Sequence, residues 1–255
     1  MNFRIIAYIV GWVCNFQAIF TVLPCITALV YQEHEFFAFL ISMILCLIVG
    51  IPLTARKPKN KVFYTKDGCV AVALSWLALC IFGSVPFVLS GSIPHPIDAF
   101  FETVSGFTTT GSSILTDVEV LPHCILMWRS FTHWIGGMGV LVFLLSLLPL
   151  AGGYHMNLMK AESPGPTVSK FVPRVRGTAK ILYQIYLGMT LFTIAALLLS
   201  GMKTFDSVTL AMGAAGTGGF AVLNSGCAVY TPLQQWILTI AMIAFGVNFN
   251  FYYLM

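Results

Sequence analysis

The sequence predicts an all-α integral membrane protein: an N-terminal helical hairpin followed by two repeats, each a helix, a short pore helix and a second helix. Three observations support this. Hydrophobic residues make up 58% of the 255 residues, charged residues only 9%, and the mean hydropathy is +0.89. A soluble domain of this length needs more surface charge. Long apolar runs alternate with two shorter, similar segments.

The distribution of charge predicts the orientation in the membrane. Eleven of the thirteen Lys and Arg residues lie at the N-terminus or in two loops, residues 55–66 and 160–180, and seven of the nine acidic residues lie in the alternate loops. By the positive-inside rule, the N-terminus and both basic loops are cytoplasmic. The seven Cys residues lie mostly in apolar runs without a CxxC motif, so we interpret them as packing residues.

The N-terminal hairpin, residues 1–66, contains two expected spans. Residues 5–31 form the first, with a kink at Pro24, and residues 36–53 form the second, which leaves the membrane at Pro52. No polar constellation is evident in it, which favours a peripheral packing role.

The repeats follow, as residues 67–175 with the basic loop and 176–255. In the first, residues 69–89 span outward, 96–113 re-enter and 123–150 span back. In the second, residues 179–200 span, 204–220 re-enter and a last helix starts at 233. An offset of 108 superposes four pairs: Asp98 on Asp206, Gly111 on Gly219, Leu115 on Leu223, and Trp128 on Trp236. We interpret this as an internal repeat in one orientation.

The first re-entrant segment has the features of a pore loop. Pro96 and Asp98 suit the first turn of a helix, and twelve residues at about 1.5 Å each cover roughly half of a hydrocarbon core. The non-helical residues 108–112 can lie at membrane depth only where protein or a water-filled cavity satisfies their backbone. Their hydroxyls and carbonyls, with the turn that Gly111 permits, suit a dehydrated monovalent cation.

The second segment, residues 212–220, is rich in glycine. No Lys follows as in a phosphate-binding loop, so phosphate binding is disfavoured. Close helix packing is the alternative for any glycine run in a membrane, and it fits residues 136–139 better than the two loops, where we favour ion coordination.

Two ionisable residues lie within one expected span. Arg129 and His133 are four residues apart and share a helix face. Two interpretations stay open for Arg129: it steadies the pore loop through the loop carbonyls or Glu102, or it extends toward the membrane surface. A proton-relay role for His133 is the weaker hypothesis.

Several motifs together resemble a known family. They are FFETVSGFTTTGSS (100–113), WRSFTHWIGGMGVLV (128–142), AESPGP (161–166) and GTGGF (216–220). In this order they resemble the membrane subunit of bacterial Trk-type potassium uptake systems, related to Ktr and plant high-affinity potassium transporters. The resemblance covers essentially the whole chain.

The resemblance implies four potassium-channel-like repeats around one pore, each supplying one filter strand. It matches Thr109, Thr110 and Gly111 to the first strand, and Thr217, Gly218 and Gly219 to the second, as K⁺ ligands. It further implies a multi-pass protein of the cell inner membrane, not an enzyme, with K⁺ as the transported ion and no organic cofactor or nucleic acid. A cytoplasmic nucleotide-binding regulatory subunit and a homodimer of the full-length subunit are the implied partners.

The chain departs from this pattern because only two repeats are present and it stops within an apolar run at residues 250–255. Either it is the N-terminal half of a longer protein, which we favour, or two copies assemble. The function expected is potassium uptake through a re-entrant filter. A sodium-coupled transporter of a small solute is the alternative, although such proteins normally carry inverted repeats and a polar pocket.

Overall fold

The computed structural model describes residues 1–58, 64–139 and 175–254, and every regular element in these ranges is a helix. The predicted all-α class is confirmed. The helices, in chain order, are α1 (Phe3–Phe20), α2 (Val22–Tyr31), α3 (Phe36–Ala55), α4 (Thr65–Leu89), α5 (Pro96–Phe107), α6 (His123–Gly137), α9 (Val175–Leu199), α10 (Thr204–Ala215), α11 (Pro232–Gly246) and α12 (Phe249–Leu254).

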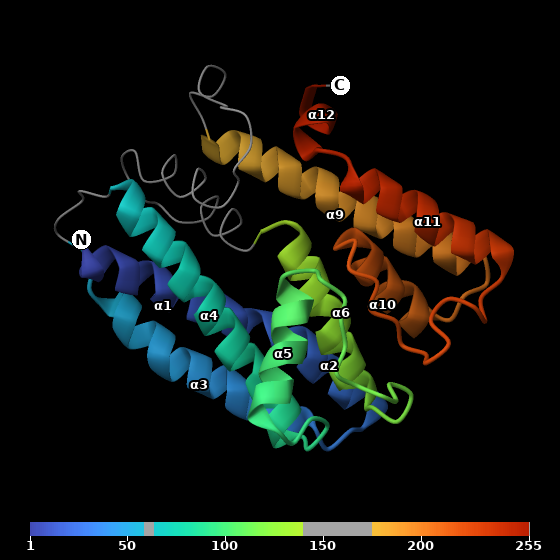
Figure 1. The fold of residues 1–255 in the computed structure, drawn as a ribbon, viewed down its shortest axis with the longest axis horizontal. Coiled ribbons are helices and arrows are strands. Elements are labelled where there is room, and N and C mark those ends of the chain that lie inside the picture. Colours follow the sequence, from blue (N-terminus) through green and yellow to red (C-terminus); the bar gives the residue numbers. More distant parts are fainter. Residues whose placement is uncertain (59–63, 140–174, 255) are drawn as a thin grey trace.

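The helices form two groups joined by α5 and α6. Helices α1, α3 and α4 lie at one end, and α9, α10 and α11 lie at the other (Figure 1). In the described ranges, four segments are long and apolar enough to cross a membrane: Phe3–Tyr31, Phe36–Ala55, Lys66–Leu89 and Ile181–Leu199.

The first span is interrupted near the expected kink. Helix α1 ends at Phe20 and α2 begins at Val22. Pro24 lies in the first turn of α2 and has no N–H to donate to the carbonyl of Phe20. The structure therefore confirms a proline-associated break in this span.

The second span continues beyond its expected exit. Helix α3 includes Pro52 and ends at Ala55. Its last turns pack closely on α1, where a Cβ added to Gly11 would lie 3.1 Å from the carbonyl oxygen of Gly50. Support from the neighbouring helix holds the residues after the proline in helical conformation, so the helix ends two residues beyond the expected limit of the span at residue 53.

The hairpin is more than peripheral packing. The buried amide of Gln17 donates a 2.9 Å hydrogen bond to the carbonyl oxygen of Leu79 in α4, and Ser42 donates to the carbonyl oxygen of Phe82. Glu33, in the turn after α2, reaches the start of α6. The sequence analysis did not identify these polar contacts to α4 and α6, which lie at three separate places and do not form one cluster.

Helix α6 ends earlier than the expected span of residues 123–150. It stops at Gly137, and Gly139 has a left-handed φ of +68°. Tyr183 of α9 donates its hydroxyl to the carbonyl oxygens of Met138 and Gly139, at 3.2 and 2.9 Å. Residues 140–150 lie outside the described part of the chain, as does AESPGP (161–166).

Glycines in α6 allow other elements to approach closely. A Cβ on Gly136 would overlap the carbonyl of Phe107, and one on Gly137 would lie 2.8 Å from the Cα of Gly216. The close-packing interpretation of residues 136–137 is confirmed, and both contacts are made to residues at the ends of the pore helices.

The last helix is also broken: α11 ends at Gly246 and α12 begins at Phe249. Trp236 of α11 is 64% exposed, whereas Trp128 of α6 is fully buried and donates its indole N–H to the carbonyl oxygen of Gly83. This pair matches in sequence but not in environment. One reason is that α11 starts 109 residues after α6, which rotates the two tryptophans out of register.

Candidate filter strands

The two pore helices correspond residue for residue. Helix α5 and helix α10 each contain 12 residues, and their first and last positions differ by 108 in both cases. An acidic residue lies in the first turn of each, Asp98 and Asp206, where the helix dipole favours a carboxylate. The helix predicted over residues 96–107 is therefore found with its expected bounds.

The chain leaves both helices by the same hydrogen bonds. After α5, the N–H of Thr109 donates to the carbonyl of Gly106, and the N–H of Thr110 donates to that of Ser105. After α10, the same pair of bonds runs from Thr217 and Gly218 to the carbonyls of Ala214 and Gly213. These bonds satisfy carbonyls at the helix end and turn the chain into the following strand.

Both strands contain the same alternation of backbone conformation. Thr109 and Gly111 have φ values of +54° and +77°, and Thr217 and Gly219 have φ values of +53° and +84°. A left-handed conformation is costly for a threonine, by about 1–3 kcal/mol, and such residues cluster at functional sites. Their recurrence at one offset indicates a constraint on the strand backbone that both repeats share.

The two strands also meet. A Cβ on Gly111 would overlap the carbonyl oxygen of Gly218, so the backbones touch at these positions. The structure thus brings the two predicted triads together, 109–111 and 217–219. Thr110, Thr217 and Gly219 are exposed in this chain, and Thr109, Gly111 and Gly218 are partly buried.

A buried ion pair fixes the end of the first strand. Arg129 Nε lies 2.7 Å from Glu102 Oε1, with both side chains buried. Glu102 also accepts hydrogen bonds from the hydroxyl of Ser113, at 3.0 Å, and from the N–H of Ile114, at 2.9 Å. The carboxylate of the pore helix therefore holds the chain that returns from the strand.

Arg129 extends the same network to the second strand. Its Nη1 donates to the carbonyl oxygen of Ala221 at 3.3 Å, and its guanidinium lies 4.1 Å from the ring centroid of Phe220. Of the two interpretations that the sequence left open, the structure supports the one in which Arg129 steadies the loops. Sequence reasoning had not identified Phe220 or Ala221 as its partners.

His133 lies one turn further along α6 and is fully buried. Its ring stacks on Phe220, with a centroid separation of 3.9 Å and an angle of 17°. It therefore packs against the second strand, and among the described residues neither ring nitrogen has a hydrogen-bond partner through which a proton could pass.

The loops that follow the strands bind each other. Asn224 Nδ2 donates to Asp117 Oδ1 at 2.7 Å, the N–H of Asn224 donates to Glu119 Oε1 at 2.9 Å, and the N–H of Val118 donates to Asn224 Oδ1 at 2.8 Å. The amide of Asn224 is the main cause that lowers the pKa of Asp117. Sequence reasoning missed Asn224, since a lone Asn in a loop carries no distinctive pattern.

Glu33 caps α6. Its two carboxylate oxygens accept from the N–H groups of His123, at 2.6 Å, and Cys124, at 2.9 Å. Partial burial alone would raise the pKa of Glu33, but the hydrogen bonds from Cys124 and His123 outweigh it and lower the pKa. Glu33, Glu35 and Cys124 lie close enough to share a cation. Both carboxylate oxygens of Glu33, however, already accept hydrogen bonds from the first N–H groups of α6.

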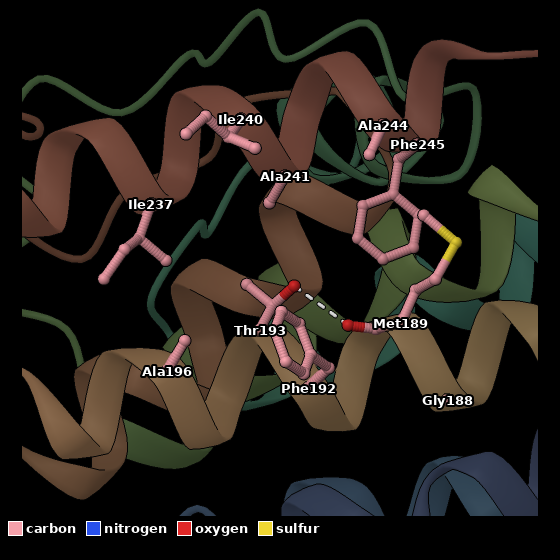
Figure 2. Close-up of a pocket in the computed structure, with 10 residues that line it drawn as sticks. All are labelled: Gly188, Met189, Phe192, Thr193, Ala196, Ile237, Ile240, Ala241, Ala244 and Phe245. Carbon is pink, nitrogen blue, oxygen red and sulfur yellow. Dashed lines mark hydrogen bonds between the residues drawn. The ribbon is translucent and has the colours of Figure 1, made fainter.

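An apolar groove lies between α9 and α11, with a volume of about 540 Å³ (Figure 2). Its lining residues are Gly188, Met189, Phe192, Thr193, Ala196, Ile237, Ile240, Ala241, Ala244 and Phe245. The one side-chain hydroxyl among them, on Thr193, already donates to the carbonyl oxygen of Met189 at 2.9 Å. This lining does not suit the polar solute that the alternative function requires.

Comparison with known proteins matches residues 34–255 to the family described as TrkH, cation transport protein. The Trk system potassium uptake protein TrkH of Escherichia coli K12 is 34% identical over 258 positions, which cover 99% of this chain and 53% of that protein. An uncharacterized cation transporter of Methanocaldococcus jannaschii is 38% identical over 221 positions, covering 86% of this chain and 45% of that protein.

A solved structure also matches. The crystal structure of the potassium transporter TrkH from Vibrio parahaemolyticus superposes with a TM-score of 0.82 at 29% identity, covering 99% of this chain and 52% of that one. This match supports the predicted pore-helix repeats. The chain spans about half the length of the relatives that it matches.

Proposed function

The chain belongs to the TrkH family of cation transport proteins, and from this we propose that it takes part in potassium uptake across a membrane. The observation that supports this most is the pair of strands with matched left-handed residues, Thr109 and Gly111 in one, Thr217 and Gly219 in the other. Potassium filters are built from strands whose carbonyl oxygens replace the hydration shell of the ion.

We assign the ligands to residues 109–111 and 217–219, the two triads expected from the sequence. Left-handed residues alternate with residues of ordinary φ in each triad, and this alternation aims successive carbonyls to one side of a strand. Known potassium filters use four strands. This chain supplies two, so the proposed pore needs two more, from further sequence or from a second copy.

The remaining proposals follow from charge and from the family. A cell inner membrane location with a cytoplasmic N-terminus agrees with the basic loops 55–66 and 160–180. We divide the chain into a hairpin (1–66), a first repeat with its basic loop (67–175) and a second repeat (176–255). K⁺ is the cargo, with no enzymatic activity and no organic cofactor. Partners are a nucleotide-binding regulatory subunit at the basic loops and a second full-length subunit.

The test is rubidium tracer uptake into proteoliposomes, with K⁺ and Na⁺ as separate competitors. It uses the complete reading frame that contains residues 1–255, with the 255-residue chain in parallel. Uptake that K⁺ blocks and Na⁺ does not is the expected result for the complete protein. Uptake blocked equally by both ions, or by Na⁺ alone, contradicts the proposal.

Gly111→Ala and Gly219→Ala test the assignment of the strands. Left-handed φ values strain alanine by about 1 kcal/mol or more, and at Gly111 the new methyl also overlaps the Gly218 carbonyl. We expect both variants to be produced at normal levels with a reduced preference for K⁺ over Na⁺.

Gly188→Ala is the matched control, because Gly188 is helical, has ordinary φ and has open space around it. It should behave as the unmodified protein does. Full K⁺ preference in Gly111→Ala and Gly219→Ala would remove the basis for the assignment.

A further inference from the structure

The position of His133 has a consequence for the second strand. Helix α6 packs against both pore helices, α5 and α10, and His133 lies on it with no exposed surface. It is therefore part of the wall behind the two strands.

The imidazole ring touches the strand at Gly218. A Cβ on Gly218 would lie 2.6 Å from Nε2 and 2.7 Å from Nδ1 of His133, distances that real Cβ atoms essentially never show. The same ring stacks on Phe220, and the carbonyl oxygen of His133 would lie 2.5 Å from a Cβ on Gly216. His133 thus contacts alternate residues along the strand.

On its other side, Gly218 contacts the first strand, because its carbonyl oxygen occupies the space where Gly111 would carry a Cβ. The order in space is His133, then Gly218, then Gly111. Since protein interiors are close-packed and transmit displacement, the ring limits how far the second strand can move away from the first.

We propose that His133 is a positioning residue that sets the separation of the two filter strands and thereby the preference for K⁺. This inference rests on the proposed function. The size of the space between carbonyls is one of the two physical origins advanced for potassium selectivity, so a residue that fixes this spacing influences selectivity without binding the ion.

The test exploits the space at Gly218. Its φ is not left-handed, so Gly218→Ala is disfavoured by the imidazole and not by backbone strain. We expect Gly218→Ala to lower K⁺-preferring rubidium uptake by about tenfold, as for one overpacked methyl, and Gly218→Ala/His133→Ala to recover most of it. His133→Ala alone should lose preference for K⁺ over Na⁺, because the space that the ring filled behind Gly218 is then empty, whereas in the double variant the methyl at position 218 fills part of it.

Gly219→Ala is the matched control. Gly219 has a φ of +84° and nothing within 4 Å of an added Cβ, so its alanine variant is strained by the backbone whatever lies at position 133. We expect His133→Ala not to rescue Gly219→Ala. The contrast between the two double variants stands whether or not His133→Ala alone is recovered as folded protein.

Rescue at position 218 but not at 219 supports the proposal. Equal loss in both double variants, or full K⁺ preference in His133→Ala, overturns it. An unmodified complete protein that takes up no rubidium contradicts the proposed function instead. In that case the unfolding temperatures of the same variants test the contact between His133 and Gly218. His133→Ala should raise the unfolding temperature of Gly218→Ala, because relief of the clash at position 218 does not depend on transport.

Discussion

At the scale of single residues, the Arg129 guanidinium and the Glu102 carboxylate depend on each other, because both are buried and lie 2.7 Å apart. A buried charge that loses its partner destabilises a protein by about 3–5 kcal/mol, whereas loss of both charges costs less. The same pair holds Ser113 of one loop and Ala221 of the other.

We therefore expect Arg129→Gln to lower the unfolding temperature strongly, and Glu102→Gln/Arg129→Gln to be less destabilised than the sum of the two single variants. Arg129→Lys keeps the charge but lacks the planar group that reaches several partners. We therefore expect both Arg129→Gln and Arg129→Lys to have a reduced preference for K⁺ over Na⁺. Thermal unfolding in detergent and competed rubidium uptake measure the two effects.

Lys203→Gln is the control for Arg129→Gln, since it removes an exposed cation and should change neither quantity. Strict additivity of the Glu102 and Arg129 variants would contradict the coupling.

At the scale of elements, Glu33 connects the N-terminal hairpin to the start of α6. Capping groups and carboxylates at helix N-termini each stabilise by about 0.5–2 kcal/mol. We expect Glu33→Ala to lower the unfolding temperature and Glu35→Ala to have little effect, because the Glu35 side chain makes no cap hydrogen bond to α3. Equal effects of the two variants would show that general charge and not capping is responsible.

Acidification should act on the same elements. The pKa values of Glu33 and Asp117 are lowered in the folded protein, so these groups stabilise it above their unfolded values, about 4.3 and 3.9, and this contribution is lost as pH falls through the lower folded values. We expect the unfolding temperature to decrease when the pH is lowered below about 4.

Glu33→Gln/Asp117→Asn should weaken this dependence on pH. Unfolding curves recorded from pH 3 to pH 7 test it, and an unchanged slope in the double variant would assign the acid sensitivity to other carboxylates.

The pore helices were the most predictable elements. Pro96 and Asp98 mark the start of α5, and the hydroxyl and glycine residues after Phe107 mark its end, so both limits depend on local chemistry. Repetition at an offset of 108 then located α10. Helix ends that depend on packing were less predictable: α3 passes through Pro52 because α1 supports it, and α6 stops at Gly137 although apolar residues continue.

The candidate site was predictable in part for the same reason. Gly111 and Gly219 could be identified because left-handed conformations favour glycine. Thr109 and Thr217 have the same left-handed conformation, but threonine has no preference for it that would allow a prediction from sequence. Contacts between distant segments, such as Asn224 with Asp117, depend on tertiary structure that periodicity does not encode.

At the scale of the whole molecule, the two repeats are similar in backbone and different in their polar contacts. At an offset of 108, Glu102 corresponds to Leu210; Arg129 corresponds to Ile237 at that offset and to Leu238 at the offset of 109 by which α11 follows α6. Leu210 is buried, and Ile237 lines the apolar groove. The second repeat therefore has no ion pair of its own at these positions.

The ion pair of Arg129 and Glu102 has a consequence for how such a chain can change in evolution. Arg129 contacts the loops of both repeats, so one residue stabilises the chain after both strands. Leu210 and Ile237 have no such role, because they carry no charge. When one repeat supplies the stabilising contacts for both, the corresponding positions of the other repeat can accept substitutions that suit contact with lipid or with another helix. We therefore expect positions 210 and 237 of the second repeat to tolerate substitution better than Glu102 and Arg129 of the first.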